Sequence, residues 1–156
     1  MRKEFRVVAV LLIWSIAFII RYTHSPGYYN NRVLTPTLSS YYLQLQALKD
    51  YRDPEGFIGR IDVESLDKKN SATDREITVT IRVQMNPVFE YLTEKEAETK
   101  LVQIGKTLRR LEQNARDESG LQSALKRSRN KGKILVKDEL VMLYVTRSGE
   151  AEFPKE

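Results

Sequence analysis

The residues able to do chemistry are few and scattered in this chain of 156 residues. His24 is the only histidine and there are no cysteines, so cysteine nucleophiles and thiolate metal sites are excluded. A single histidine also argues against Ser-His-Asp catalysis and against zinc bound by several histidines. No glycine pattern matches a phosphate-binding loop. The sequence therefore predicts a protein that is not an enzyme and that needs no metal or cofactor.

Two pairs of carboxylates keep acid–base chemistry open as an alternative. Asp62 and Glu64 alternate along a predicted strand and share one of its faces, while Asp53 and Glu55 flank a proline. Two carboxylates held together can act as general acid and general base. The strand face in question is the polar one, where carboxylates usually serve solubility. We expect no reaction there.

The most concentrated polar feature is the stretch KRSRNKGK, at residues 126–133. It contains five cations and no acid, and these form the basic segment: Lys126, Arg127, Arg129, Lys131 and Lys133. Such a run can bind nucleic acid, anionic headgroups or an acidic protein surface. It is also typical of a helix C-terminus followed by a polar turn. Both interpretations stay open from the sequence.

An uncharged run near the start, VVAVLLIWSIAFII at residues 7–20, decides where the rest of the chain resides. Extended from Phe5 to Tyr22, it reaches roughly 27 Å as a helix, enough for a thin bilayer. Within residues 7–20, Ser15 is the only polar residue, which disfavours a core helix of a soluble domain. A signal peptide cleaved after Ala17 is the closer alternative. An uncleaved anchor is favoured because Phe18 and the following isoleucines continue the run beyond that position.

The flanking charges indicate an orientation. Three basic residues precede the run within the first six positions, so the positive-inside tendency places the N-terminus in the cytoplasm. We expect a single-pass protein of the inner (cytoplasmic) membrane, with residues 23–156 outside the cytoplasm. Membrane lipid and other membrane or envelope proteins are then the expected partners, and nucleic acid is not.

Patterning divides the chain into four parts. Residues 1–22 form a cytoplasmic stub and transmembrane anchor, and residues 23–35, rich in Pro, Gly, Asn and Thr, form a linker. Residues 36–147 form an extracytoplasmic domain, and residues 148–156 a flexible tail. With 41% hydrophobic and 30% charged residues, the chain is too apolar to be disordered throughout.

The domain is expected to begin with a helix capped by Thr35 and opened by Pro36. One apolar stripe follows it at helical spacing, and consists of Leu38, Tyr41, Leu45 and Leu48. Packing of this stripe on the core is the favoured interpretation. Self-association of the chain through the same four residues is the alternative, because anchoring raises the local concentration of neighbours.

The remaining elements follow from period and capping signals. Two amphipathic strands cover residues 57–66 and 75–85, and the second alternates apolar and polar residues throughout. Thr93 and Glu96 have the spacing of a capping box at the start of a long helix, which Gly120 interrupts before a shorter helical piece. Residues 133–146 form one or two strands with apolar residues on both faces, as in a central strand.

This order predicts an α+β fold, in which helices pack on one face of a small antiparallel sheet in the order α-β-β-α-β. An anchor followed by such a domain resembles, in element order, the ring-building domains of bacterial secretion and sporulation machines, and small flagellar accessory proteins. The resemblance implies a structural or assembly subunit of an envelope complex. The alternative is a tethered binding module that uses the basic segment for an anionic ligand.

Overall fold

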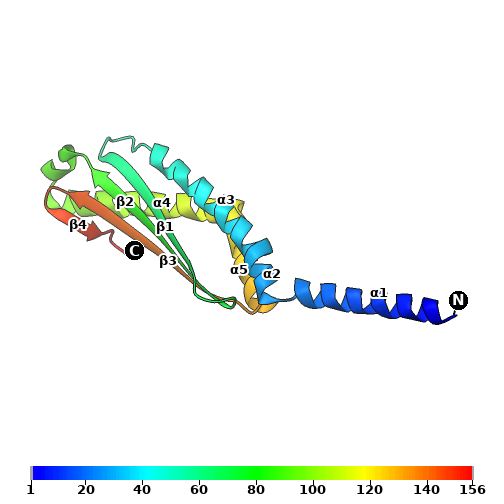
Figure 1. Ribbon diagram of the computed structural model, residues 1–156. Helices are drawn as coiled ribbons and strands as arrows, with labels where there is room; N and C mark the ends of the chain where they lie inside the picture. Colours follow the sequence, from blue (N-terminus) through cyan, green and yellow to red (C-terminus); the bar gives the residue numbers. More distant parts are fainter. Residues whose placement is uncertain (1, 156) are drawn as a thin grey trace.

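The computed structural model describes residues 2–155 and joins one apolar N-terminal helix to a domain of mixed helix and sheet (Figure 1). The helical elements are α1 (Arg2–Thr23), α2 (Pro26–Tyr28), η1 (Tyr29–Leu34), α3 (Thr35–Leu45), η2 (Gln46–Asp50), η3 (Pro87–Tyr91), α4 (Glu94–Glu118) and α5 (Leu121–Asn130). The strands are β1 (Ile58–Lys69), β2 (Asp74–Met85), β3 (Leu135–Thr146) and β4 (Gly149–Glu152). Helix α1 extends away from the domain.

The four strands form one sheet in the order β1-β2-β3-β4. Strands β1 and β2 are an antiparallel hairpin, β2 and β3 are parallel, and β3 and β4 are an antiparallel hairpin. The predicted all-antiparallel sheet is therefore wrong at its centre. The chain leaves the end of β2, returns through α4 and α5, and enters β3 at the opposite end, so β3 must run in the same direction as β2.

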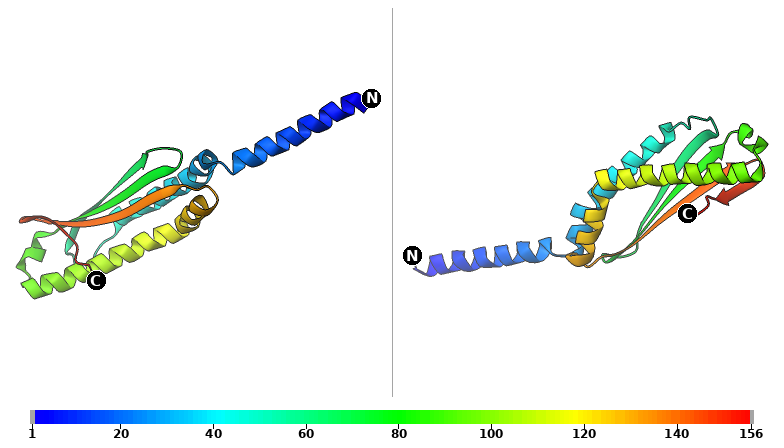
Figure 2. Two further views of the ribbon diagram at one scale, coloured as in Figure 1. Left: turned by 90° about the horizontal axis from the view of Figure 1, so that it is seen from below. Right: turned by 180° about the vertical axis from the view of Figure 1, so that it is seen from behind.

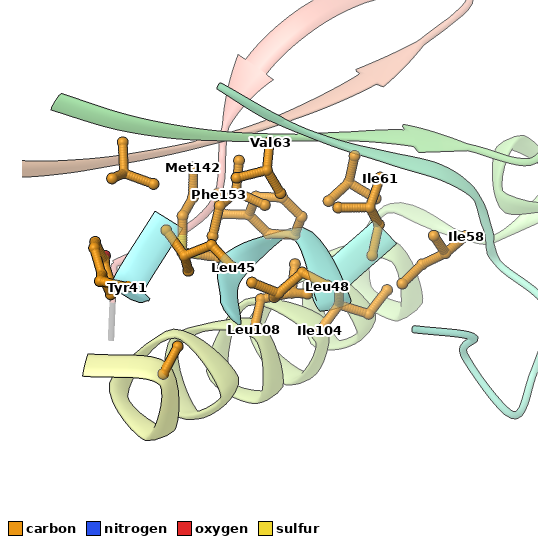
Figure 3. Close-up of a cluster of buried hydrophobic side chains, with 14 of the residues drawn as sticks. Tyr41, Leu45, Leu48, Ile58, Ile61, Val63, Ile104, Leu108, Met142 and Phe153 are labelled. Atoms are coloured by element: carbon orange, nitrogen blue, oxygen red, sulfur yellow. The ribbon is translucent and has the colours of Figure 1, made fainter. Parts of the chain in front are cut away.

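The helices cover one face of the sheet and leave the other face open (Figure 2). Burial along β2 alternates strictly, and its inward side chains, Ile77, Val79, Ile81, Val83 and Met85, are at most 7% exposed. This confirms the face predicted from the alternation. Figure 3 shows the inward residues of the strands meeting those of α3 and α4 in a single core. The two-layer arrangement predicted for the domain is thus present.

The predicted boundaries of the long helix are confirmed. Thr93 caps α4, its hydroxyl accepting from the backbone N–H of Glu96 while the Glu96 carboxylate accepts from the N–H of Thr93. Gly120 separates α4 from α5 with a φ of 72°, in the left-handed region that favours glycine. The chain turns there, and α5 is placed against the start of β3.

Two segments expected to lack structure are part of the fold. Residues 26–34 of the predicted linker are helical, and Asn30 and Leu34 are fully buried. The predicted tail forms β4 and then buries Phe153 in the core, at 3% exposed. Both segments are polar in composition, and in each case one or two apolar side chains among polar neighbours fix the segment to the domain.

Thr35 does not cap α3, because the helical backbone is continuous from Tyr29 through the π-helical turn into α3. Its hydroxyl instead donates to the carbonyl oxygen of Asn30 at 2.6 Å. Pro36 is the second residue of α3 and has no N–H, so it donates no backbone hydrogen bond to the preceding turn. The predicted helix is present, and its predicted first residue is wrong.

A buried polar network ties the two layers together. The hydroxyl of Tyr41 donates to Oε1 of Glu112 at 2.5 Å, and Arg116 donates to the same oxygen at 2.9 and 3.1 Å. Arg116 also pairs with Asp138 on β3 and lies over the Tyr41 ring, 5.4 Å from its centroid. Desolvation opposes the charge of Arg116, but the Asp138 hydrogen bond and the Glu112 charge outweigh it and raise the pKa of Arg116.

Removing the Tyr41 hydroxyl is expected to change how stability depends on pH. Burial, and then the bond to Glu112, raise the pKa of Tyr41 above its ordinary value of 10.0. The folded chain therefore holds this proton more tightly, and the stability it contributes is complete below pH 10 and lost as the pH rises above it. In denaturant titrations of the full chain in detergent, Tyr41→Phe should lose less unfolding free energy than the unmodified chain between about pH 9 and about pH 11.

The matched control is Tyr91→Phe, which removes the hydroxyl of a ring that is 86% exposed. This variant is expected to follow the unmodified chain at every pH. An alkaline loss of stability that is as steep in Tyr41→Phe as in the unmodified chain would contradict the assignment.

Candidate functional site beside the N-terminal helix

The basic segment lies at the end of the domain from which α1 departs (Figure 1). Its first three cations are on α5, and the other two are in the turn that leads into β3. Helix α5 packs against η1, and the approach is so close that a β-carbon at Gly132 would lie 2.7 Å from Cγ of Tyr29. Position 132 therefore needs glycine, and the turn that carries Lys131 and Lys133 is fixed to the first structured residues after α1.

Aromatic rings connect this end of the domain to α1. Phe18 stacks on Tyr22 at 6.5 Å between centroids, Tyr22 meets Tyr28 edge-on at 5.7 Å, and Tyr28 meets Tyr29 at 5.9 Å. Tyr22 is 52% exposed, whereas Tyr29 is 7% exposed. The row thus begins on the exposed surface of α1 and ends in the packed domain. Tyrosine and other amphipathic rings favour the headgroup level of a bilayer.

All five cations of the basic segment are exposed. Within residues 2–155, none of them forms an ion pair within 4 Å, whereas Arg75, Arg82, Lys100 and Arg116 are each paired with a carboxylate. Arg32 on η1 is exposed on the neighbouring element and is also without such a pair in the described chain. The charge here is not neutralised within the fold, and it is available to an anionic partner.

A hollow of about 580 Å³ opens between α5 and the start of β3. Lys126 and Arg129 contribute its cationic rim, and its apolar wall includes Leu125, Ile134 and Val136. Asp138 also lines it, but this carboxylate is bound by Arg116. Two cations of the basic segment, Lys126 and Arg129, therefore line the hollow. The other three, Arg127, Lys131 and Lys133, do not.

A second buried polar network holds η1 against the tip of the β1–β2 hairpin. Arg75 is 5% exposed, and its guanidinium donates twice to Asp67, at 2.7 Å each. It also donates to Oδ1 of Asn30 and to the hydroxyl of Thr35, at 2.9 Å each. Asn30 in turn donates to the carbonyl oxygen of Ala72 at 3.3 Å. These contacts fix η1 and the start of α3 relative to the tip of the hairpin.

Sequence reasoning missed this network, although a signal was present. Arg75 has the same parity as Ile77 and Val79 and therefore lies on the inward face of β2. An arginine at an inward position needs a buried acceptor. That requirement indicates a carboxylate on the paired strand. Asp67 is near enough, because it lies two residues before Lys69, the residue directly opposite Arg75 in the ladder.

The side chains considered for chemistry are placed apart, and their polar atoms have structural roles. His24 is exposed, with Nδ1 2.8 Å from the carbonyl oxygen of Ile20. Asp62 is paired with Arg60, and Glu64 lies 3.4 Å from Arg82 on the open face of the sheet. Asp53 accepts from the N–H of Phe57. Between residues 2 and 155, no three His, Cys, Asp or Glu side chains come close enough to hold a metal ion.

The four residues of the α3 stripe lie in the core. Leu38, Tyr41, Leu45 and Leu48 are between 0 and 4% exposed and pack against the sheet and α4. Their burial within one chain fits core packing, the favoured interpretation, and leaves none of them on the surface for self-association. Comparison of the chain with protein-family models, with curated proteins and with solved structures found no match.

Breaking the network at the base of the domain should destabilise it strongly. Arg75→Ala leaves the buried Asn30 and the partly buried side chain of Asp67 without their donor, and we expect a loss of about 3 kcal/mol in unfolding free energy. The matched control is Arg82→Ala, whose guanidinium pairs with Glu150 and Glu64 on the exposed face. That change should cost less than about 1 kcal/mol. Denaturant titration of both variants measures the difference, and equal losses would refute the structural role of Arg75.

Proposed function

We propose that this chain is a single-pass membrane protein whose α+β domain is a non-enzymatic structural or assembly subunit of an envelope complex. The observation that carries the proposal is the surface of α1. The segment Lys3–Thr23 has a mean hydropathy of 2.0, and 0% of it is buried within the fold. Trp14 and Phe18 are more than 70% exposed. An apolar helix that its own domain does not cover needs an apolar environment from outside, and a bilayer provides one.

The domain supports a role in assembly. It presents an open sheet face, and it carries exposed charge on α5, which packs against η1. The polar groups that could act as acids or bases serve as capping, pairing and turn contacts. A compact domain held close to a membrane by a short connection is suited to binding neighbouring proteins, because tethering raises the effective concentration of weakly binding partners. Envelope machines for secretion or motility are the class suggested by the order predicted from the sequence, α-β-β-α-β, to which the structure adds α5 and β4.

Cysteine accessibility tests the membrane topology directly, since the chain has no native cysteine. In intact cells, Ser148→Cys should react with a membrane-impermeant maleimide, and Lys3→Cys should react only after permeabilisation. Both residues are exposed, so access within the folded chain does not differ. Reaction at both positions in permeabilised cells is the control. Recovery of the full chain in the soluble fraction, or protection of position 148 in intact cells, would refute the proposal.

A second candidate function is the binding of anionic phospholipid by the basic segment. The observation that favours it is the position of five unpaired cations beside the end of α1, next to a row of aromatic rings. If α1 spans the bilayer, these cations face the headgroups of the same leaflet. Each Lys or Arg near an anionic surface contributes about 1 kcal/mol of attraction at physiological salt. The domain would then rest against the membrane and would not move freely above it.

Hydrogen exchange in lipid nanodiscs measures this contact. Backbone exchange at residues 126–133 should be slower in discs containing anionic phosphatidylglycerol than in purely zwitterionic discs, and Lys131→Glu/Lys133→Glu should abolish the difference. The matched control is Lys106→Glu/Arg110→Glu, at exposed positions on α4. That variant should keep the lipid dependence. The same exchange in both kinds of disc for the unmodified chain would exclude headgroup binding.

A further inference from the structure

Strand β3 has a vacant edge over half of its length. It pairs with β2 from Leu135 to Val145, but β4 pairs only with residues 143–146. The last contact on that side is the N–H of Phe153 donating to the carbonyl oxygen of Met142 at 3.0 Å. Pro154 follows and has no N–H to continue the ladder. Among residues 2–155, no backbone group pairs with the β4 side of β3 before Met142.

The direction of the backbone groups follows from this contact. Met142 directs its carbonyl toward the β4 side, and Leu135 directs its N–H toward β2, bonding Thr73 at 2.7 Å. Because successive residues of a strand alternate in direction, Val136, Asp138 and Leu140 present their N–H and C=O groups to the vacant edge. The side chain of Asp138 is only 23% exposed although the residue is exposed as a whole. Its accessible surface is therefore largely main chain.

The sequence of this edge, LVKDELV at residues 135–141, is complementary to itself when reversed. We infer that the vacant edge of β3 pairs antiparallel with the same edge of a second copy of this chain, around a twofold axis at Asp138. Leu135 then faces Val141 of the second copy, Val136 faces Leu140, and Lys137 faces Glu139. Each apolar residue then meets an apolar residue and Lys137 meets Glu139, while Asp138 lies on the axis opposite Asp138 of the second copy.

This register uses the whole edge and leaves only the two Asp138 residues opposite a like charge, whereas every other pair is matched. Centring the pairing on Lys137 places two lysines opposite each other, and centring it on Glu139 places two glutamates opposite each other. Like charges in such positions are destabilising. At the Asp138 centre, three pairs of residues exchange two backbone hydrogen bonds each. The ladder ends where Phe153 occupies the next position, at Met142.

Hollows lie where the inward side chains of the second copy would enter. Leu140 of that copy faces Val136 and enters the hollow of about 580 Å³ that α5 forms with β3. Val136 of that copy faces Leu140 and enters a hollow of about 210 Å³, which Leu140, Met142 and Phe153 line. Each hollow is lined by both polar and apolar residues, and its apolar part, Leu125, Ile134 and Val136 in the first and Leu140, Met142 and Phe153 in the second, can contact an aliphatic side chain.

The axis brings the two Asp138 carboxylates together, and this contact must be neutralised. Each is already bound by the Arg116 guanidinium of its own chain, with one bond at 3.3 Å and a second, shorter one. Lys126 and Arg129 line the same hollow. Cations of both copies therefore surround the pair of carboxylates and offset their repulsion. In this interface, Lys126 and Arg129 of the basic segment stabilise the contact between the two copies.

The other edge of the sheet differs. On β1, Asp62 and Glu64 follow one another on the open face, so the register centred between them places two pairs of acids opposite each other. Charges of this kind protect an edge strand against pairing. The two edges therefore provide a matched comparison within one protein. Residues 137 and 139 on β3, and residues 62 and 64 on β1, are both two positions apart and both lie on the open face of the sheet.

Disulfide trapping tests the pairing in membranes prepared from cells that express the full chain. Residues 137 and 139 of opposite copies form a non-hydrogen-bonded pair, with Cα atoms about 4.5 Å apart, which suits a disulfide. Mild oxidation of Lys137→Cys/Glu139→Cys should give a covalent dimer, and the matched Asp62→Cys/Glu64→Cys on β1 should give no covalent dimer. Equal trapping at the two edges, or none at β3, would overturn the inference.

Charge exchange supplies a second readout that needs no crosslink. Glu139→Lys places two lysine pairs across the interface and should raise the dimer dissociation constant roughly tenfold, measured by analytical ultracentrifugation in detergent. Adding Lys137→Glu restores opposite charges and should restore the dimer. Failure of the double exchange to rescue would refute the register. The pairing needs only the folded domain, so the two proposals can fail separately. A chain that is soluble and dimeric would refute the membrane proposal and leave this inference standing. A chain that is membrane-bound and monomeric would refute this inference and leave the membrane proposal standing.

Discussion

The parallel pairing of β2 with β3 is the constraint on which the rest of the domain depends. Because β3 must begin at the same end of the sheet as β2, the chain has to return along the whole sheet before it can enter β3. The connection is made by α4 and α5, which together with α3 form the helical layer that covers the core. The same return places the end of α5, with its cations, beside the first structured residues after α1. The position of the basic segment is thus a consequence of topology.

Two buried arginines stabilise this arrangement at different places. Arg116 joins α4 to α3 and β3 through Glu112, Tyr41 and Asp138, in the middle of the domain. Arg75 joins the hairpin tip to η1 at the end beside α1. A buried guanidinium is tolerated only when most of its donors are satisfied, so each network specifies a particular relative position of the elements it connects. Apolar packing alone would permit more sliding of η1 over the hairpin.

Patterns local in sequence predicted the local structure well. The alternation in β2, the capping box at Thr93 and the break at Gly120 each depend on residues within a few positions of one another, and all three are confirmed. Strand direction was predicted wrongly, because it depends on where a connection of many residues ends. The helical turn at residues 26–34 was missed because its stability comes from Arg75 and Gly132, which are distant in sequence. The location of the basic segment was unpredictable for the same reason.

The membrane proposal and the β3 pairing restrict each other geometrically. Paired antiparallel, the two β3 strands run in opposite directions, so the two α1 helices leave the dimer at opposite ends. Both can enter one bilayer only when the sheet lies along the membrane surface. The chain can change direction at His24 and Ser25, which separate α1 from α2 and where Ser25 is extended with ψ at 149°. The twofold axis then stands along the membrane normal, and both basic segments lie at the same height above the lipid. A dimer of this kind would place two anchors one domain length apart, and it would present a single continuous sheet to the partners of the complex.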